Sequence, residues 1–338
     1  MARIALDAMG GDLAPQAPIA GALMALAEID TSNVIQLVGK SETIEAELDR
    51  QLAAHGAPKN ARDRLVIIEA PQVIEMSDRP SAAVRGKPNS SMVVGLKLHA
   101  SGEADGFISA GNTGAQMAAS VVLLKLHEGL TRPAIATLFP TARAPVVVLD
   151  AGANVDCDAL ELVQFARLGS VYAEDILGRS DPVVGLISIG EEPEKGNAAV
   201  KEAHRLLSAA DLNFIGNVEG RDILTGGGPH GQVDVFVCDG FVGNVLLKFY
   251  ESVPEMVFGM MRHTGVTQEL LDKTFKGFDY SDYGGAPLLG VRGVSIISHG
   301  SSSPRAIKNA IGVALRAIET DMDDHIGRRL ANCTVSGE

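Results

Sequence analysis

The residues best suited to chemistry lie in turns rich in Gly, Asn, Asp and Ser that follow short apolar runs. Five such turns stand out: DAMGGD (7–12), SAGNTGA (109–115), LDAGAN (149–154), SIGEEPEKGN (188–197) and SHGSSSP (298–304). Small residues let backbone N–H groups approach a ligand closely, and a helix start adds the positive end of its dipole. This combination favours phosphate or another oxyanion. On parallel strands, several such turns would open at one edge of the sheet, where α/β proteins bind ligands.

Polar side chains in these turns form the predicted site. Asn112 or Thr113 caps the following helix or contacts a ligand, and both roles use the same N–H groups. Asp150 is a site residue or an acceptor that holds a loop, and its place at the end of a strand favours the site. Lys195 belongs to a solvated charge run or reaches phosphate as a point charge. His299 is a hydrogen-bonded turn residue or a candidate for proton transfer or oxyanion contact.

The motifs of several enzyme classes are missing from the sequence. It contains no GxGxxG with a downstream ribose-binding acid, no GxxxxGK[ST] loop, no GxSxG elbow and no HExxH. Cys157, Cys238 and Cys333 lie far apart and show no zinc spacing. We therefore predict no metal, no cofactor and no covalent serine nucleophile.

The composition limits the partners and the compartment. The 338 residues include 29 basic and 42 acidic side chains, a net charge of −13, and this balance disfavours a general nucleic-acid binder. The N-terminus lacks the apolar stretch of a secretory signal, and no run approaches the roughly 18 apolar residues of a spanning helix. We expect a cytoplasmic protein with no nucleic-acid partner.

The elements that must position these turns follow an alternating pattern. Strands are predicted at residues 3–6, 34–38, 65–69, 105–109, 134–138, 146–149, 183–187, 213–216, 233–237 and 295–298. Helices are predicted at residues 17–29, 42–55, 90–100, 113–124, 157–177, 198–209, 244–261 and 305–321. The alternation indicates a mainly parallel sheet with helices on both faces. The length suits one large domain or two in intimate contact, and we predict a single α/β domain over residues 1–338.

Two regions depart from the alternation. Residues 71–89 carry three Pro residues and are expected to form a long loop or broken helix. Residues 244–285 are expected to form a helical projection, and residues 245–261 hold eleven large apolar side chains. Pro254 is expected to kink this segment or to begin a second helix. The segment is either a buried crossover helix or an exposed apolar pair that touches a partner subunit, an acyl chain or a membrane.

Several of these segments together resemble the bacterial phosphate acyltransferase family, PlsX. The resemblance runs nearly end to end and rests on IALDAMGGD, SAGNTGA, LDAGAN, the KGN turn, NVEGRDI (217–223), DVFVCDGFVGNVLLK (234–248), GAPLLGV (285–291) and SHGSS. It implies an enzyme of glycerophospholipid synthesis that converts fatty acyl-acyl-carrier-protein and inorganic phosphate to acyl phosphate and free carrier protein. It also implies a Rossmann-like fold, similar to that of phosphate acetyltransferases and isocitrate/isopropylmalate dehydrogenases. Members are homodimeric, cytoplasmic and peripherally membrane-associated, which we expect here through residues 245–261.

The resemblance also gives the site residues roles. Phosphate would attack the thioester carbonyl directly, so the protein must position it and stabilise a tetrahedral oxyanion. Lys195 would offset charge, Asn112, Asn154, Asn197 or Asn244 would donate to the carbonyl oxygen, and His299 would assist at most. The catalytic set is therefore Lys195, Asn244 and His299. The predicted phosphate- and substrate-binding set is Asp7, Gly10, Gly11, Asn112, Thr113, Gly114, Asp150, Asn154, Gly196, Asn197, Ser301 and Ser302.

Acyl carrier protein is acidic, so its docking site should be basic. Two patches are candidates, one of Arg79, Arg85, Lys87 and Lys97 and one of Arg262, Lys273 and Lys276. Three other functions stay open: a short-chain phosphotransacetylase that uses acyl-coenzyme A, an isocitrate-type dehydrogenase, and a non-catalytic protein that binds lipid or acyl carrier protein.

Overall fold

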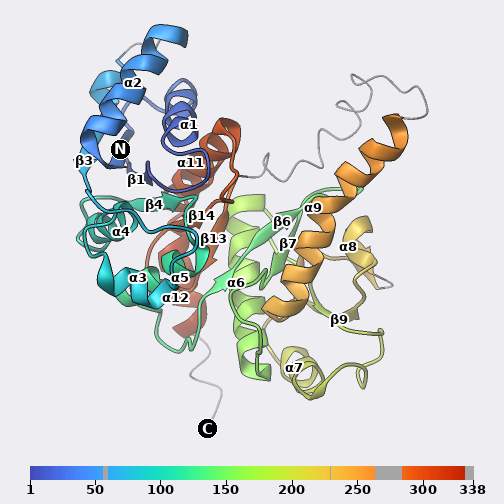
Figure 1. The fold of residues 1–338 in the computed structure, drawn as a ribbon. Coiled ribbons are helices and arrows are strands. Elements are labelled where there is room, and N and C mark those ends of the chain that lie inside the picture. Colours follow the sequence, from blue (N-terminus) through green and yellow to red (C-terminus); the bar gives the residue numbers. More distant parts are fainter. Residues whose placement is uncertain (56–59, 229, 263–283, 332–338) are drawn as a thin grey trace. The chain divides into compact units, whose positions relative to one another are not determined.

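The computed structural model describes residues 1–55, 60–228, 230–262 and 284–331. The chain forms two compact units, Met1–His127 with Tyr283–Asp324 and Glu128–Asp282 with His325–Glu338. Each unit contains a mainly parallel sheet covered by helices (Figure 1). The predicted α/β architecture is therefore confirmed.

The sheet of the first unit holds the strands that carry three of the predicted turns. The strands that this unit contributes lie in the order β3 (Leu65–Glu69), β2 (Val34–Gly39), β1 (Arg3–Asp7), β4 (Gly106–Ser109), β14 (Ser295–Ile297) and β13 (Ala286–Leu289), and only the last of these pairings is antiparallel. Its helices are α1 (Gln16–Leu26), α2 (Ser41–His55), α3 (Pro80–Gly86), α4 (Ser91–Ala100), α5 (Thr113–Leu123) and α11 (Pro304–Glu319), with a short 3-10 helix at Arg62–Arg64. Helix α1 packs closely on α11, because a Cβ on Gly21 would lie only 2.5 Å from Ile307 Cβ.

The sheet of the second unit carries the other two predicted turns. Its order is β6 (Thr137–Phe139), β7 (Val146–Leu149), β12 (Val235–Val237), β8 (Val184–Ile187) and β9 (Phe214–Val218), with β6 antiparallel to the rest. Around it lie β5 (Ala134–Ile135), α6 (Ala159–Leu177), α7 (Ala198–Ser208), α8 (Asp222–Thr225), β10 (Gly227–Gly228), β11 (Gly231–Gln232) and α9 (Gly240–Arg262), and α12 spans Met322–Ala331.

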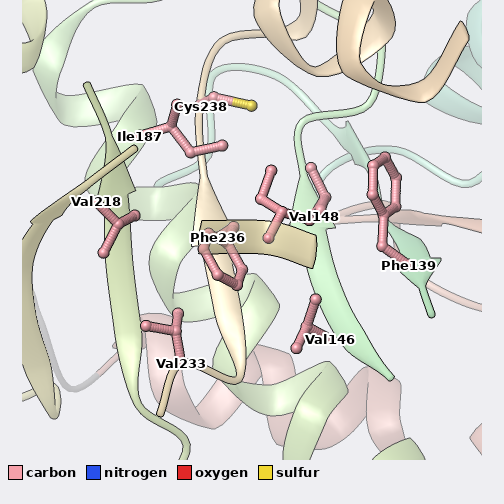
Figure 2. Packing of buried hydrophobic residues seen from close by; sticks show 9 residues of the cluster. Phe139, Val146, Val148, Ile187, Val218, Val233, Phe236 and Cys238 are labelled. Carbon is pink, nitrogen blue, oxygen red and sulfur yellow. The ribbon is translucent and has the colours of Figure 1, made fainter. Parts of the chain in front are cut away.

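An apolar cluster fills one face of the second sheet. Figure 2 shows Phe236 at its centre, with Val146 and Val148 from β7 on one side and Val218 from β9 on the other. Tyr250 of α9 packs against the same cluster, and its ring lies 4.8 Å from that of Phe139. This burial fixes the strands whose ends carry the site.

The helices and strands differ from the predicted ones at a few places. Strands β10, β11 and β13 and helices α8 and α12 were not predicted, and the expected strand at 134–138 is two short strands, β5 and β6. Helix α3 lies within residues 71–89, in agreement with a broken helix. Helix α9 runs across Pro254, so a second helix beginning there is wrong. A proline removes one intrahelical hydrogen bond, and the preceding turns of α9 are held by their packing on the core.

Helix α9 combines both interpretations of the apolar segment. Leu246, Leu247 and Tyr250 pack against the core, whereas Phe249 and Met260 are 63% and 59% exposed. Residues 263–283, half of the predicted projection, lie outside the described residues, as do Lys273, Lys276 and Cys333. None of the described helices is both long and apolar enough to cross a bilayer.

Candidate functional site

Three of the predicted turns meet at the carboxyl edge of the first sheet, after β1, β4 and β14. The Ser109 hydroxyl donates to Asp7 Oδ2 at 2.7 Å, and the Ser298 N–H donates to the Ser109 carbonyl at 2.8 Å. The Asp12 N–H donates to the Gly300 carbonyl at 2.7 Å. The predicted convergence of these turns at one edge is therefore confirmed within this unit.

Glycines allow the first unit's turns to close on one another. A Cβ on Gly10 would lie 2.7 Å from Asp7 Oδ2 and 2.8 Å from Ser109 Oγ. Gly11 has a φ of +99°, and a Cβ there would lie 2.9 Å from the Gly300 carbonyl oxygen. Only glycine fits both positions, so their backbone comes close to whatever occupies this edge.

Asp7 lies beneath these turns. It is 2% exposed, and burial raises the pKa of its carboxyl, against hydrogen bonds from the Ser91 and Ser109 hydroxyls and the Met9 and Gly10 N–H groups. With its oxygens turned to these donors, Asp7 holds the turns together from below.

Asn112 takes the capping role that the sequence left open. Its Oδ1 accepts from the Ala115 N–H at 3.0 Å, and its Nδ2 lies within 3.1–3.3 Å of the carbonyl oxygens of Glu75, Met76 and Asp78. The side chain thus holds the 75–78 loop against the start of α5. The N–H groups of Thr113 and Gly114 belong to the first turn of α5, where a helix offers donors without an intrahelical partner.

His299 lies exposed at the end of β14. Its Nδ1 accepts from the Ser301 N–H at 3.3 Å and lies 2.8 Å from Ser301 Oγ. An N–H donor at Nδ1 places the proton of a neutral imidazole on Nε2. The Ser302 N–H donates to the His299 carbonyl at 2.9 Å, and Ser303 caps α11 by accepting from the Ala306 N–H at 3.2 Å.

In the second unit, Asp150 organises the turn after β7. The residue is fully buried, and Oδ1 accepts from the N–H groups of Ile135, Gly152 and Ala153. Oδ2 accepts from the Asn154 N–H at 2.7 Å and from its Nδ2 at 2.9 Å. Burial raises the pKa of Asp150, against the N–H groups that stabilise the carboxylate. These bonds match the loop-holding alternative for Asp150, which the sequence ranked second.

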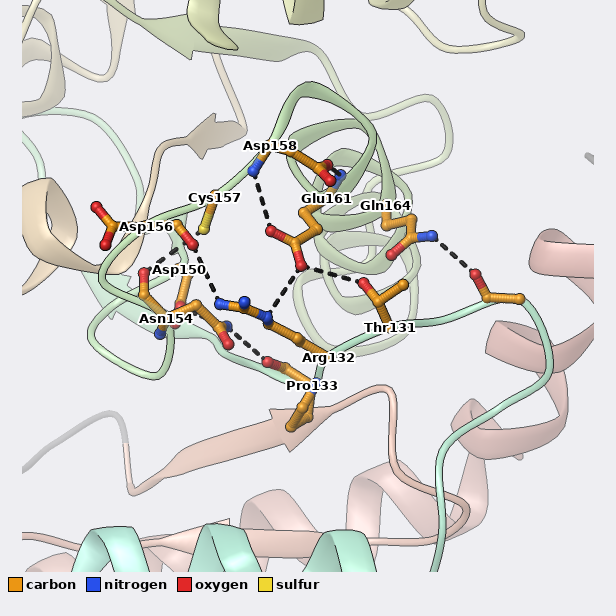
Figure 3. A network of polar contacts seen from close by, with 11 residues as sticks. Thr131, Arg132, Pro133, Asp150, Asn154, Asp156, Cys157, Asp158, Glu161 and Gln164 are labelled. Carbon is orange, nitrogen blue, oxygen red and sulfur yellow. Dashed lines mark hydrogen bonds and ion pairs between the residues drawn. The ribbon is translucent and has the colours of Figure 1, made fainter.

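A second polar network continues from this loop. Figure 3 shows the Asn154 amide reaching the Pro133 carbonyl, at 2.8 Å, and Arg132 paired with Glu161 at 3.0 Å. Cys157 lies beside them, and burial raises the pKa of its thiol to about 12. A thiol of that pKa is a poor nucleophile at neutral pH.

The start of α9 lies against the Asp150 loop. The Gly240 N–H donates to the Asn154 carbonyl at 2.7 Å, and Asp239 caps the helix by accepting from the Val242 N–H at 2.8 Å. One turn later, the exposed Asn244 side chain lies 3.4 Å from the Cβ position of Gly152. Within the described part of the chain, the Asn244 amide makes no hydrogen bond.

The turn after β8 presents Lys195. The side chain is exposed, and its ammonium group has neither a hydrogen bond nor an ion pair with the residues that the structure describes. Gly196 follows with a φ of +104°, and Asn197 caps α7 by accepting from the Val200 N–H at 2.9 Å. Among the described residues, Lys195 is therefore an unpaired cation beside a helix start.

Asn217 anchors this turn and was missed as a functional residue. It is fully buried, its Nδ2 donates to the Glu192 carbonyl at 2.8 Å, and its Oδ1 lies 3.0 Å from His204 Nδ1. The Lys195 N–H donates to the same Glu192 carbonyl at 3.0 Å. The only sequence signal was its place in NVEGRDI.

Among the described residues, no group of three His, Cys, Asp or Glu side chains is arranged to hold a metal.

Comparisons with known proteins agree on one family. The model of a family described as "Fatty acid synthesis protein" matches residues 2–325. A phosphate acyltransferase of Desulforamulus reducens is 47% identical over 342 residues, covering 98% of both chains, and one of Salinibacter ruber is 45% identical, covering 96% of both. This chain belongs to the phosphate acyltransferase family, PlsX. The family resemblance stated from the motifs is confirmed.

Solved structures place the phosphate acyltransferase chain in a wider fold group. A phosphotransacetylase from Streptococcus pyogenes superposes with a TM-score of 0.62 at 20% identity, covering 94% of both chains. A 4-hydroxythreonine-4-phosphate dehydrogenase structure from Salmonella typhimurium gives 0.51 at 13% identity, covering 94% of this chain and 99% of its own. At such identities the likeness concerns the fold alone, and it confirms the Rossmann-like α/β fold.

Proposed function

We propose that the chain transfers a fatty acyl group from acyl carrier protein to inorganic phosphate in phospholipid synthesis. The products are acyl phosphate and free carrier protein. The observation that carries this proposal is the near-full-length similarity to phosphate acyltransferases. The turns support it, since they combine close backbone approach, helix-start N–H groups and a free cation, which suit oxyanions.

The chemistry requires no covalent enzyme intermediate. A phosphate oxygen attacks the thioester carbonyl carbon, a tetrahedral oxyanion forms, and its collapse breaks the C–S bond and releases thiolate. In the second unit, Lys195 offsets negative charge and Asn244 donates to the carbonyl oxygen, because both side chains are exposed and uncommitted. In the first unit, the N–H groups of Thr113 and Gly114 bind an oxyanion.

The test is incubation of the protein with palmitoyl-acyl-carrier-protein, with and without phosphate, followed by trapping of acyl phosphate with hydroxylamine. We expect phosphate-dependent loss of thioester that EDTA does not affect. Unchanged thioester in phosphate buffer would contradict the proposal, as would activity that EDTA abolishes and magnesium restores. Acetyl-coenzyme A in a parallel reaction tests the alternative of a short-chain phosphotransacetylase.

We also propose a cytoplasmic homodimer that contacts the membrane peripherally through residues 245–261. The support is the apolar face of α9, where Val245, Phe249, Met256 and Met260 are all more than half exposed. Replacing Met256 and Met260 with Glu should reduce co-sedimentation with liposomes while sparing turnover of soluble substrate. Unchanged co-sedimentation would contradict membrane contact, and sedimentation equilibrium of the native protein tests the dimer.

A further inference from the structure

One stretch of the first unit reverses the charge balance of the chain. Between Asp78 and Glu128 the sequence holds five Lys or Arg residues and only two acids, Glu103 and Asp105. Asp105 is paired with Arg3 at 3.0 Å. In a chain with a net charge of −13, this stretch is a local source of positive potential.

Three of these cations face solvent without an acidic partner. Arg85 Nε donates to the Ser81 carbonyl at 3.2 Å and Lys97 Nζ to the Pro88 carbonyl at 3.0 Å, and Arg79 is exposed at the start of α3. None of the three forms an ion pair with any residue that the structure describes. Lys87 differs, because Asp78 neutralises it at 2.5 Å. We call Arg79, Arg85 and Lys97 the α3–α4 basic surface.

This basic surface begins at a turn of the candidate site. Both neighbours of Arg79 touch the 109–115 turn: the Asp78 carbonyl lies 3.1 Å from Asn112 Nδ2, and Pro80 Cγ lies 2.7 Å from the Cβ position of Gly114. Helix α3 packs on α5 and is about 10 Å long at 1.5 Å per residue. Lys97 bonds to the carbonyl of Pro88, three residues after Arg85. The three cations therefore follow the chain from the start of α3 to the segment after its end.

We propose that the α3–α4 basic surface docks the acidic protein that carries the acyl thioester, an inference that rests on the proposed function. A carrier with many carboxylates is repelled by most of this acidic chain and attracted where cations lack partners. The thioester must also reach an oxyanion site, and this surface adjoins the first turn of α5. Docking on this surface therefore both attracts an acidic carrier and brings its thioester close to the first turn of α5.

The experiment compares two thioesters in phosphate buffer, palmitoyl-acyl-carrier-protein and palmitoyl-pantetheine, which lacks the protein. The triple variant Arg79→Glu, Arg85→Glu, Lys97→Glu should raise the KM for the carrier-protein substrate at least about tenfold. Its kcat and KM for palmitoyl-pantetheine should stay within about twofold of wild type, because the three side chains touch no reacting atom. In the wild type, added NaCl should raise only the carrier-protein KM.

A matched control changes the same net charge elsewhere. Lys40→Glu, Arg143→Glu, Arg328→Glu alters three exposed cations that belong to neither α3 nor α4 and should leave both KM values unchanged. If the Glu variant is unstable, the milder replacement of Arg79, Arg85 and Lys97 by Gln takes its place. It should raise the carrier-protein KM by less than the Glu variant would. An equal rise in KM in the control, or an unchanged carrier-protein KM in both α3–α4 variants, would overturn the docking surface alone.

Two further outcomes separate this inference from others. Loss of binding to anionic vesicles with an unchanged carrier-protein KM would identify the surface as a lipid contact and overturn the carrier proposal. A carrier-protein KM that does not change with salt would also overturn the docking surface. If palmitoyl-pantetheine is still turned over in a phosphate-dependent reaction, the proposed function stands. Failure of the wild type to convert either thioester overturns the proposed function and the docking surface together.

Discussion

The two units build similar turns at the carboxyl edges of their sheets and use the polar side chains in them differently. In the first unit, Asp7, Ser109 and Asn112 all bond to neighbouring turns or loops, so the exposed donors are largely backbone N–H groups. In the second unit, Asp150 is likewise bonded to its own loop, whereas the exposed Lys195 and Asn244 side chains have no partner among the residues that the structure describes. Most of these polar side chains therefore hold the turns together through hydrogen bonds, and fewer are available to contact a ligand.

This difference separates residues that shape the site from residues that act in it. Substituting a buried polar residue that holds the turns together should lower the free energy of unfolding. The groups that were hydrogen-bonded to it then lose their partner inside the protein. Substituting an exposed, unpaired group should lower turnover and leave the free energy of unfolding unchanged. Two variants from each unit test this distinction, taken from the largest expected effect to the smallest.

The largest effect is expected for Asp150→Ala. The change leaves four backbone N–H groups and the Asn154 amide without their acceptor. Removing one member of a buried, charge-assisted network costs about 3–5 kcal/mol. Urea unfolding followed by circular dichroism measures the loss. Asp239→Ala is the control, since losing a helix cap costs only about 1 kcal/mol. A loss for Asp150→Ala no greater than for this control would show that the loop does not depend on the carboxylate.

Lys195→Ala should act on turnover instead. Loss of one charged contact to a transition-state oxygen is worth about 2–4 kcal/mol, or roughly 30- to 1,000-fold in kcat/KM for phosphate. The free energy of unfolding should not change, because the ammonium has no partner in the described part of the chain. Lys201→Ala, an exposed lysine on α7, is the matched control. Wild-type kinetics at limiting phosphate would reduce Lys195 to a surface charge.

Ser109→Ala tests the first unit. The hydroxyl donates to buried Asp7 and accepts the Gly111 N–H at 3.0 Å, so its removal takes one of several donors from Asp7 and leaves the buried Gly111 N–H without this acceptor. We expect a loss of about 1–3 kcal/mol in unfolding free energy. Ser101→Ala is the control, because its hydroxyl bonds lie at the exposed end of α4. If Ser109→Ala lowers turnover with no change in unfolding, the hydroxyl contacts substrate and the distinction between the units fails.

The sequence predicted the strands and the turns well because both leave local signals. Buried parallel strands such as β7 are continuous apolar runs, and glycines mark the turns that must approach one another. The convergence of three turns in the first unit followed from the rule that parallel strands end at one edge.

The roles of individual side chains could not be predicted in the same way. The sequence favoured Asp150 as a site residue, whereas its five donors include Ile135, fifteen positions away on another strand. Asn217 fastens the Lys195 turn from β9, a contact across 25 positions that no local pattern reveals. Helix α9 crosses Pro254 because its packing on the core, a tertiary effect, outweighs one lost hydrogen bond.

The smallest effect is expected for His299→Gln. His299 is exposed in a turn of the first unit and was predicted to assist catalysis at most. Its Nδ1 is already an acceptor for the Ser301 N–H, and the thiolate produced by the reaction leaves readily without a proton donor. We therefore expect kcat to fall by no more than about threefold, with an unchanged pH profile. A general acid contributes about 10²–10⁴-fold, so the two outcomes are easily distinguished. Ser301→Ala, which removes only the hydroxyl beside Nδ1, should have an equally small effect. A hundredfold fall in kcat for His299→Gln, with loss of the alkaline limb of the pH profile, would make His299 a proton donor and give the first unit a catalytic side chain of its own.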